Sequence, residues 1–150
     1  MISKWITKIG AFLLLCFTQI VLGQTVIHPF VMSSDNLAGD LFKHSEAVTQ
    51  THEDGNVTID KTSMLSSDNK FASGVYSSGK TTFDITDSYG VDEFMYFLSG
   101  SVTLTSADGS EVTVGAGDSV TLPKEWTGKW STEGYTKIWV IYSADGSGLE

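Results

Sequence analysis

Short runs of β-forming residues separated by glycine turns fill the chain from Phe71 onward. The runs are rich in Val, Ile, Thr and aromatic residues, and no helical period of ten residues interrupts them. Strands are predicted over Phe71 to Ser77, Thr81 to Thr86, Glu93 to Leu98, Val102 to Thr105, Glu111 to Val114, Ser119 to Leu122, Gly128 to Ser131 and Lys137 to Tyr142. The pair Asp108-Gly109 predicts a tight hairpin. Evenly spaced short strands of this kind predict an all-β sandwich or barrel.

The segment before these strands is less regular. Val26 to Met32 and Val57 to Leu65 could each form a strand, and one helical turn is expected between Leu37 and His44. We therefore expect an irregular N-terminal extension, residues 24–69, that packs on a barrel formed by residues 70–150.

Residues 1–23 have the pattern of a secretory signal peptide. Lys4 and Lys8 precede an apolar run from Ala11 to Leu22, and Gly23 suits the position before a cleavage site. The run is shorter than the about 20 apolar residues that span a bilayer. The pattern predicts export to the periplasm or the medium, cleavage near Gly23, and no stable membrane span afterwards.

The charge of the chain argues against a nucleic-acid partner. It has 9 basic and 18 acidic residues, and all the basic ones are lysines. Loss of the signal removes two lysines and no acid, which takes the net charge from −9 to −11. Phosphate binding needs a basic patch, which this composition does not offer. The single cysteine, Cys16, leaves with the signal, so disulfides are not expected to stabilise the mature chain.

Two of the predicted strands are apolar on both faces. In the strand from Glu93 to Leu98, alternation places Glu93, Met95 and Phe97 on one face, with Phe94, Tyr96 and Leu98 on the other. The strand from Lys137 to Tyr142 has the same character. Such strands line a barrel on one side and are covered on the other. The cover is either the N-terminal segment or a second subunit, so a homodimer is one expectation.

The spacing of glutamate, glycine and proline resembles the cupin superfamily. Glu93 and Gly100 are separated by six residues, and Gly117 and Pro123 by five. Both spacings match cupin motifs, and the resemblance extends from Phe71 to Tyr142. It implies a cupin-type antiparallel β-barrel, or jelly roll.

Some segments resemble more narrowly the single-cupin group named after (S)-ureidoglycine aminohydrolase. They are Asp92 to Gly100, Gly115 to Pro123, Trp126 to Trp130 and Lys137 to Ile141. The framework residues have structural explanations. Gly100 and Gly117 are expected at strand ends where the chain turns tightly, and Pro123 at the end of a strand.

The histidines that hold a metal in many cupins are missing. The family places a His-x-His pair three or four residues before the glutamate and a third histidine five residues after the proline. The corresponding positions here are Thr86 and Ser88, or Asp87 and Tyr89, together with Gly128. Glu93 alone does not supply the three or four ligands of a transition-metal site. No cofactor is therefore predicted.

The histidines of this chain are His28, His44 and His52, which we interpret as loop or surface residues. A divalent metal held by Glu93 with Asp87, Asp84 or one of these histidines stays open as an alternative.

Glu93 is the best candidate for a catalytic or binding residue, because it points into an apolar barrel. A carboxylate there needs a partner, or its pKa rises until it is neutral. Lys137 is the expected partner and Lys124 the second choice. Aromatic side chains with a few polar groups describe a small-molecule pocket. The predicted ligand-binding set is Glu93, Lys137, Trp126, Trp130 and Tyr76, while Trp139 and Tyr96 are expected in the core.

Three functions are consistent with these residues. The first is a binding module for a small polar metabolite, the second a metal-dependent hydrolase similar to ureidoglycine aminohydrolase, and the third a structural dimer. Whether the chain is an enzyme stays open. The sequon Asn56-Val-Thr58 adds a potential glycosylation site.

Overall fold

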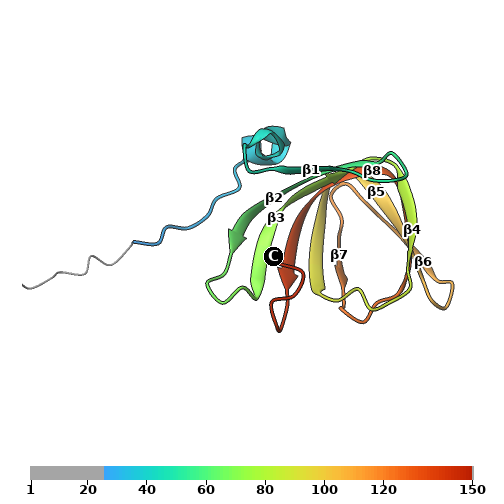
Figure 1. The fold of residues 1–150 in the computed structure, drawn as a ribbon. Helices are drawn as coiled ribbons and strands as arrows, with labels where there is room; N and C mark the ends of the chain where they lie inside the picture. The colour runs from blue at the N-terminus through green and yellow to red at the C-terminus, as the bar shows by residue number, and fades with distance from the viewer. Residues whose placement is uncertain (1–25, 150) are drawn as a thin grey trace, which may run out of the picture.

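An antiparallel sheet of eight strands curls into a barrel in the described part of the chain (Figure 1). The computed structural model describes residues 26–149, so the predicted signal peptide and its cleavage point near Gly23 lie outside the described residues. Along the sheet the strands follow the order β1-β2-β3-β8-β5-β6, with β4 pairing β8 and β7 pairing β5. The prediction of an all-β, cupin-type barrel is confirmed.

The strands and short helices have the following bounds. The strands are β1 Val48–Thr51, β2 Val57–Leu65, β3 Phe71–Ser78, β4 Thr81–Ile85, β5 Asp92–Ser106, β6 Glu111–Gly115, β7 Ser119–Leu122 and β8 Gly128–Tyr142. A π-helical turn, η1 (Asn36–Asp40), continues into a 3-10 turn, η2 (Leu41–Lys43). Among the described residues, no helix combines the length and the hydropathy of a membrane span.

Two pairs of predicted strands are in fact single long strands. Glu93 to Leu98 and Val102 to Thr105 join as β5, and Gly128 to Ser131 and Lys137 to Tyr142 join as β8. The chain bends at each junction without losing its pairing, because β5 and β8 stay hydrogen-bonded through two irregularities of register.

Gly100 explains the bend within β5. The prediction that Gly100 ends a strand is wrong. It lies within β5 with φ 69°, and a Cβ there would lie 2.0 Å from the Gly134 carbonyl oxygen. The glycine therefore permits a close approach of β8 as well as a positive φ. Gly117, with φ 89°, does lie in the turn between β6 and β7, and Pro123 follows the last residue of β7. The Asp108-Gly109 hairpin is confirmed, although only Gly109 of the two has a positive φ.

The region before Phe71 contributes two strands to the same sheet. The predicted strand from Val57 to Leu65 is confirmed as β2, and β1 adds to its edge. The helical turn expected from Leu37 to His44 is confirmed as η1 and η2. Val26 to Met32 forms no strand, and the prediction there is wrong: Val26, Ile27, Phe30 and Val31 are all exposed in an extended segment without a β partner.

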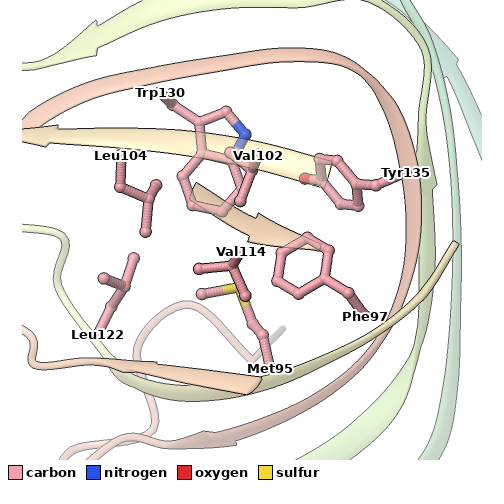
Figure 2. Packing of buried hydrophobic residues seen from close by; sticks show 8 residues of the cluster. All are labelled: Met95, Phe97, Val102, Leu104, Val114, Leu122, Trp130 and Tyr135. Atoms are coloured by element: carbon pink, nitrogen blue, oxygen red, sulfur yellow. The ribbon is translucent and has the colours of Figure 1, made fainter. Parts of the chain in front are cut away.

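Buried apolar side chains pack together inside the barrel and form its core (Figure 2). Its side chains come from β5 to β8, and they are Met95, Phe97, Val102, Leu104, Val114, Leu122, Trp130 and Tyr135. The alternation predicted for β5 is confirmed, since Glu93, Met95 and Phe97 are buried while Phe94 and Tyr96 are exposed. Towards β2, β3 and β4 the interior contains a cavity.

The N-terminal helical segment covers part of the outer face of the sheet. Val75 points away from the interior residue Tyr76 next to it, yet it is fully buried, and η2 contacts β2 and β3. Farther along the outer face, towards β5 and the far end of β8, the aromatic side chains of Phe94, Tyr96 and Tyr142 stay partly exposed.

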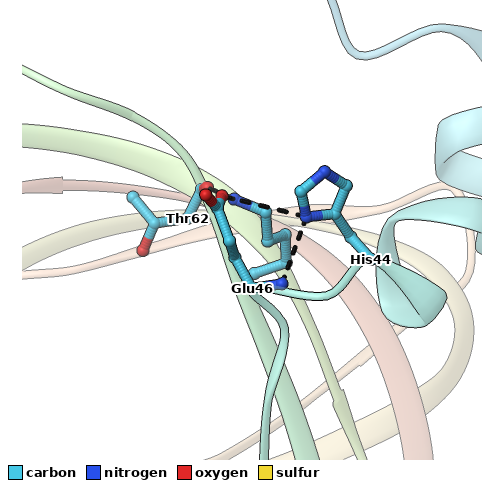
Figure 3. A network of polar contacts seen from close by, with 4 residues as sticks. His44, Glu46 and Thr62 are labelled. Carbon is cyan, nitrogen blue, oxygen red and sulfur yellow. Dashed lines mark hydrogen bonds and ion pairs between the residues drawn. The ribbon is translucent and has the colours of Figure 1, made fainter.

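An ion-pair network joins the exit of the helical segment to β2 (Figure 3). Glu46 lies between two partners: its Oε2 is 3.1 Å from Lys61 Nζ and 3.8 Å from His44 Nδ1. Lys61 Nζ also donates to the Thr62 carbonyl at 2.6 Å. His44 thus has a place in the connection between η2 and β1, as the loop interpretation expected.

Candidate functional site

The register of the sheet arranges the interior residues in rows. In one row Asp60 of β2 is opposite Tyr76 of β3, and Tyr76 is opposite Lys137 of β8. Lys137 in turn pairs with Phe97 of β5. Glu93 lies four residues before Phe97 on the same face of β5. Lys137 therefore has to reach diagonally along β5 to meet Glu93.

Glu93 and Lys137 form a buried ion pair. Lys137 Nζ lies 2.6 Å from Glu93 Oε1, and only 7% and 4% of the lysine and glutamate side chains are exposed. On its way the lysine passes Met95, whose sulfur is 2.9 Å from Nζ. Burial of two charges is costly unless both are hydrogen-bonded, and this geometry meets that condition. The predicted pairing of Glu93 with Lys137 is confirmed.

Tyr89 supplies the second hydrogen bond to Glu93. Its hydroxyl donates to Oε2, so both oxygens of the carboxylate are engaged. Burial, and then the nearby Glu93 charge, raise the pKa of the Tyr89 phenol, which keeps it protonated as a donor. The cupin resemblance places Tyr89 at one of two alternative positions for a histidine ligand, and in this chain its hydroxyl donates to Glu93.

Aromatic rings surround the ammonium group of Lys137. Nζ lies 5.5 Å from the ring centroids of Tyr76 and Trp130 and 6.0 Å from that of Tyr135. Distances of this size allow cation–π attraction, which is stronger where water is excluded. The lysine is therefore held by a carboxylate, a thioether and three rings together.

A cavity of about 320 Å³ opens beside this ion pair. Its polar lining includes Asp60, Glu93 and Lys137, and its aromatic lining consists of Tyr76, Phe83, Tyr89, Trp130, Tyr135 and Trp139. Trp130 and Tyr135 belong both to this lining and to the core cluster, so they lie between the core and the cavity. The volume is at the low end of the about 300–1,000 Å³ typical of ligand pockets.

Asp60 is placed in the cavity wall by Trp139 and Gly74. The Trp139 indole N–H donates to Asp60 Oδ1 at 3.1 Å. The indole crosses β3 at Gly74, where a Cβ would lie only 2.6 Å from the ring. A glycine inside a strand often marks such a close approach. Burial raises the pKa of Asp60, although the Trp139 hydrogen bond and the Lys137 charge act in the opposite direction.

Four of the five predicted ligand-binding residues line this cavity: Glu93, Lys137, Trp130 and Tyr76. The fifth, Trp126, is not among the lining residues. Its indole N–H donates to Ser106 Oγ at 3.3 Å, and its ring meets Tyr89 edge-on.

Two further expectations need correction. Lys124 is exposed, and its Nζ lies 3.9 Å from Glu125 instead of reaching Glu93. Tyr96, which was expected in the core, is 38% exposed, whereas Trp139 is buried as expected and also lines the cavity.

The donor set does not fit a cupin metal. Both oxygens of Glu93 are bonded to Lys137 and Tyr89, and Asp84 and Asp87 are exposed. In residues 26–149, no three His, Cys, Asp or Glu side chains group closely enough to hold a metal ion.

The position of the third cupin histidine is closed by packing. A Cβ on Gly128 would lie 2.2 Å from the Thr105 carbonyl oxygen and 2.8 Å from the Trp126 ring. Of the remaining histidines, His28 is exposed, and His52 contacts Thr58 Oγ1 at 2.9 Å.

The sequence interpretation missed Asp60, Tyr135 and Phe83 as lining residues and gave Tyr89 no role. Tyr89 could have been found, because it lies four residues before Glu93 in the position of a histidine ligand. Asp60 carried no such signal: Val57 and Ile59 lie on the opposite face of the predicted strand, so alternation would place Asp60 outside.

The sequon at Asn56 is buried in the folded chain. Only 7% of Asn56 is exposed, and its Nδ2, the atom that would carry a glycan, donates to Ser78 Oγ at 3.0 Å. A glycan at this nitrogen is therefore incompatible with the folded structure described here.

Comparison with known proteins agrees with the fold. Residues 65–137 match the family model described as the EutQ-like cupin domain. No curated protein matches the sequence. The narrower resemblance to the ureidoglycine aminohydrolase group receives no support from these matches and stays a prediction.

Solved structures with this fold come from several bacteria. The EutQ protein of Clostridium difficile has a TM-score of 0.54 and 24% identity, over 67% of this chain and 79% of that one. A putative ethanolamine utilization protein Q from Salmonella typhimurium has a TM-score of 0.51 and 16% identity, over 66% of this chain and 95% of that one. An ectoine synthase from P. lautus has a TM-score of 0.55 and 9% identity, over 79% of this chain and 78% of that one. At these identities the likeness shows the fold alone. The family match over residues 65–137 and the strand order together show that this barrel is similar to the EutQ-like cupin domains.

Proposed function

We propose that this chain is an exported single-domain cupin that binds a small polar metabolite in its barrel without the usual histidine metal site. The observation that carries the proposal is the Glu93–Lys137 pair at the wall of the cavity. A buried ion pair is not needed for stability, since apolar residues of similar volume often give a fold of equal or greater stability. Because the pair lies beside a cavity with aromatic walls, its polar groups can orient a bound ligand.

The hydrogen bonds of the pair favour binding over proton transfer. Glu93 accepts from both Lys137 and Tyr89, so it is held in one orientation. A general base needs a free lone pair within reach of the proton that it removes. Glu93 remains the best candidate for a catalytic residue, but its geometry suits a fixed acceptor. A fixed polar group loses little conformational entropy when a ligand binds.

A thermal-shift screen with small polar metabolites tests the proposal. A ligand at 100 times its Kd should stabilise the protein by about 2.7 kcal/mol. Thr62 also lines the cavity, so Thr62→Phe should narrow the cavity without changing the charge and abolish the shift, while Glu93→Gln should reduce it. Glu111→Gln is the matched control, because it removes a carboxylate from the exposed face of β6.

A full shift retained in Thr62→Phe would place the ligand elsewhere and contradict the proposal. Circular dichroism of each variant separates loss of binding from loss of fold. If Glu93→Gln does not fold, the Thr62→Phe comparison still decides the question.

The second function that the sequence left open is a metal-dependent hydrolase similar to ureidoglycine aminohydrolase. It predicts a different metal content for the purified protein. It requires stoichiometric divalent metal in the purified protein and a lower melting temperature in the presence of a chelator. Elemental analysis with a chelator titration therefore separates the two functions. Metal at one equivalent per chain would favour the hydrolase.

The export part of the proposal rests on the pattern of residues 1–23. Lys4, Lys8 and the apolar run that follows support it. Mass spectrometry of the protein isolated from the periplasm or the medium should find a chain that begins at Gln24. An intact N-terminus in the cell interior would contradict it.

We also propose a homodimer through the outer face of the sheet. Its support is the group of partly exposed aromatic side chains, Phe94, Tyr96 and Tyr142, on β5 and β8. Sedimentation of the wild type and of the double variant Phe94→Ser, Tyr142→Ser tests it. The wild type should sediment as a dimer and the variant as a monomer; a monomeric wild type would refute the proposal.

A further inference from the structure

The charges in the cavity wall do not balance. Glu93, Lys137 and Asp60 are its charged lining residues among those described. Glu93 and Lys137 neutralise each other at 2.6 Å. Asp60 has no described basic side chain within 4.0 Å of its carboxylate, although Lys137 is near enough to influence its pKa. The cavity therefore carries one carboxylate in excess.

Asp60 is held so that it faces the cavity. It lies on the interior face of β2, directly across from Tyr76 on β3. The Trp139 indole fixes Oδ1 at 3.1 Å, and Gly74 makes room for that indole. The side chain is only partly buried, so a ligand can reach it.

The walls around Asp60 favour positive charge as well. Six aromatic rings line the cavity, and the faces of such rings attract cations. Three of these rings already surround the ammonium group of Lys137, which shows that this wall accommodates a cation. Binding of an anion is disfavoured, because the ammonium group of Lys137 is already paired with Glu93 and the net charge of the chain is −9.

We propose that the cavity binds a small protonated amine, whose ammonium group pairs with Asp60 and whose compact apolar body rests against the aromatic walls. This inference rests on the proposed function, since it names the ligand class of the same cavity. The Glu93–Lys137 pair then forms the fixed polar end of the site, and Asp60 selects the charge of the ligand.

Three probes that share a tert-butyl group and differ in charge test the proposal: tert-butylammonium, tert-butanol and pivalate. Each is titrated into ¹⁵N-labelled protein, and the indole N–H resonance of Trp139 reports binding because that group is bonded to Asp60. The ammonium probe should bind roughly tenfold more tightly than the alcohol, as expected for one charge-assisted hydrogen bond. Pivalate should bind most weakly.

Asp60→Asn is the decisive variant. Its amide oxygen can still accept from Trp139, while the charge is lost, so the ammonium and alcohol affinities should become equal. Asp84→Asn is the matched control, because it removes the same charge from an exposed position on β4 and should leave the preference unchanged.

The outcomes separate this inference from the function on which it rests. Preference for pivalate or the alcohol, or a preference for the ammonium probe that survives in Asp60→Asn, overturns the amine assignment while leaving a binding cavity. Failure of all three probes to bind, in a protein that the metabolite screen does stabilise, also overturns the amine assignment. Failure in both experiments contradicts the binding function itself. Should Asp60→Asn not fold, the ranking of the three probes on the wild type still decides the ligand class.

Discussion

Replacing Lys137 with methionine is expected to destabilise the chain by about 3–5 kcal/mol, because Glu93 is then left as a buried carboxylate without its cation. Only 4% of the glutamate side chain is exposed, so water does not replace the lost partner. The Tyr89 hydroxyl remains as a donor to Oε2. That one neutral hydrogen bond offsets only part of the cost of the isolated charge.

The double variant Glu93→Leu, Lys137→Met removes the buried charge altogether. Replacement of a buried pair by apolar residues is often neutral or stabilising. The double variant should therefore be more stable than Lys137→Met alone, although the Tyr89 hydroxyl loses its acceptor. The two substitutions are thus strongly non-additive, as expected for residues in direct contact.

Urea unfolding of the four chains gives the coupling energy directly. For a chain of this size, about 3–5 kcal/mol corresponds to a fall in Tm of roughly 10–20 °C. The Lys80–Glu133 pair is the control, since its atoms are 2.8 Å apart but its side chains are 72% and 83% exposed. Lys80→Met should cost about 1 kcal/mol or less. If Lys137→Met costs no more than Lys80→Met, the pair is not buried as described and the reasoning fails.

Three further substitutions test other parts of the site. Gly74→Ala should destabilise the chain by about 1–3 kcal/mol in urea unfolding, because its Cβ would lie 2.4 Å from the Lys61 carbonyl oxygen and 2.6 Å from the Trp139 ring. Asp60→Asn should raise Tm at pH 7, and the gain should shrink as the pH falls. Burial raises the pKa of this carboxyl in the folded chain, so the stability from its protonation is present at low pH and is lost as the pH rises through that pKa. Gly128→His should lower Tm without metal uptake, because the new Cβ would lie 2.2 Å from the Thr105 carbonyl oxygen. Unchanged stability of Gly74→Ala, a lower Tm of Asp60→Asn at pH 7, or one equivalent of metal bound to Gly128→His would each contradict the structure at that point.

Much of the barrel could be predicted from alternation and turn residues. The pattern of β5 correctly placed Glu93, Met95 and Phe97 inside, because side chains along a strand alternate between two faces. The fusion of strands into β5 and β8 was missed, since glycine is an ordinary sign of a turn. Gly100 instead permits a close approach to Gly134 inside a continuous pairing. Such an approach depends on the partner strand and has no local signal.

The sequence by itself determined the cupin framework, the absence of the metal-binding histidines and the inward direction of Glu93, because these depend on residue identity, spacing and strand alternation. Only the tertiary structure decided which side chains share the cavity. Asp60 and Trp139 are far apart in the chain, and they meet because β2, β3 and β8 are neighbours and Gly74 leaves space between them. The same packing put Trp126 outside the lining and closed the position of the third histidine. Contacts across a sheet depend on strand order and register, which local patterns do not specify.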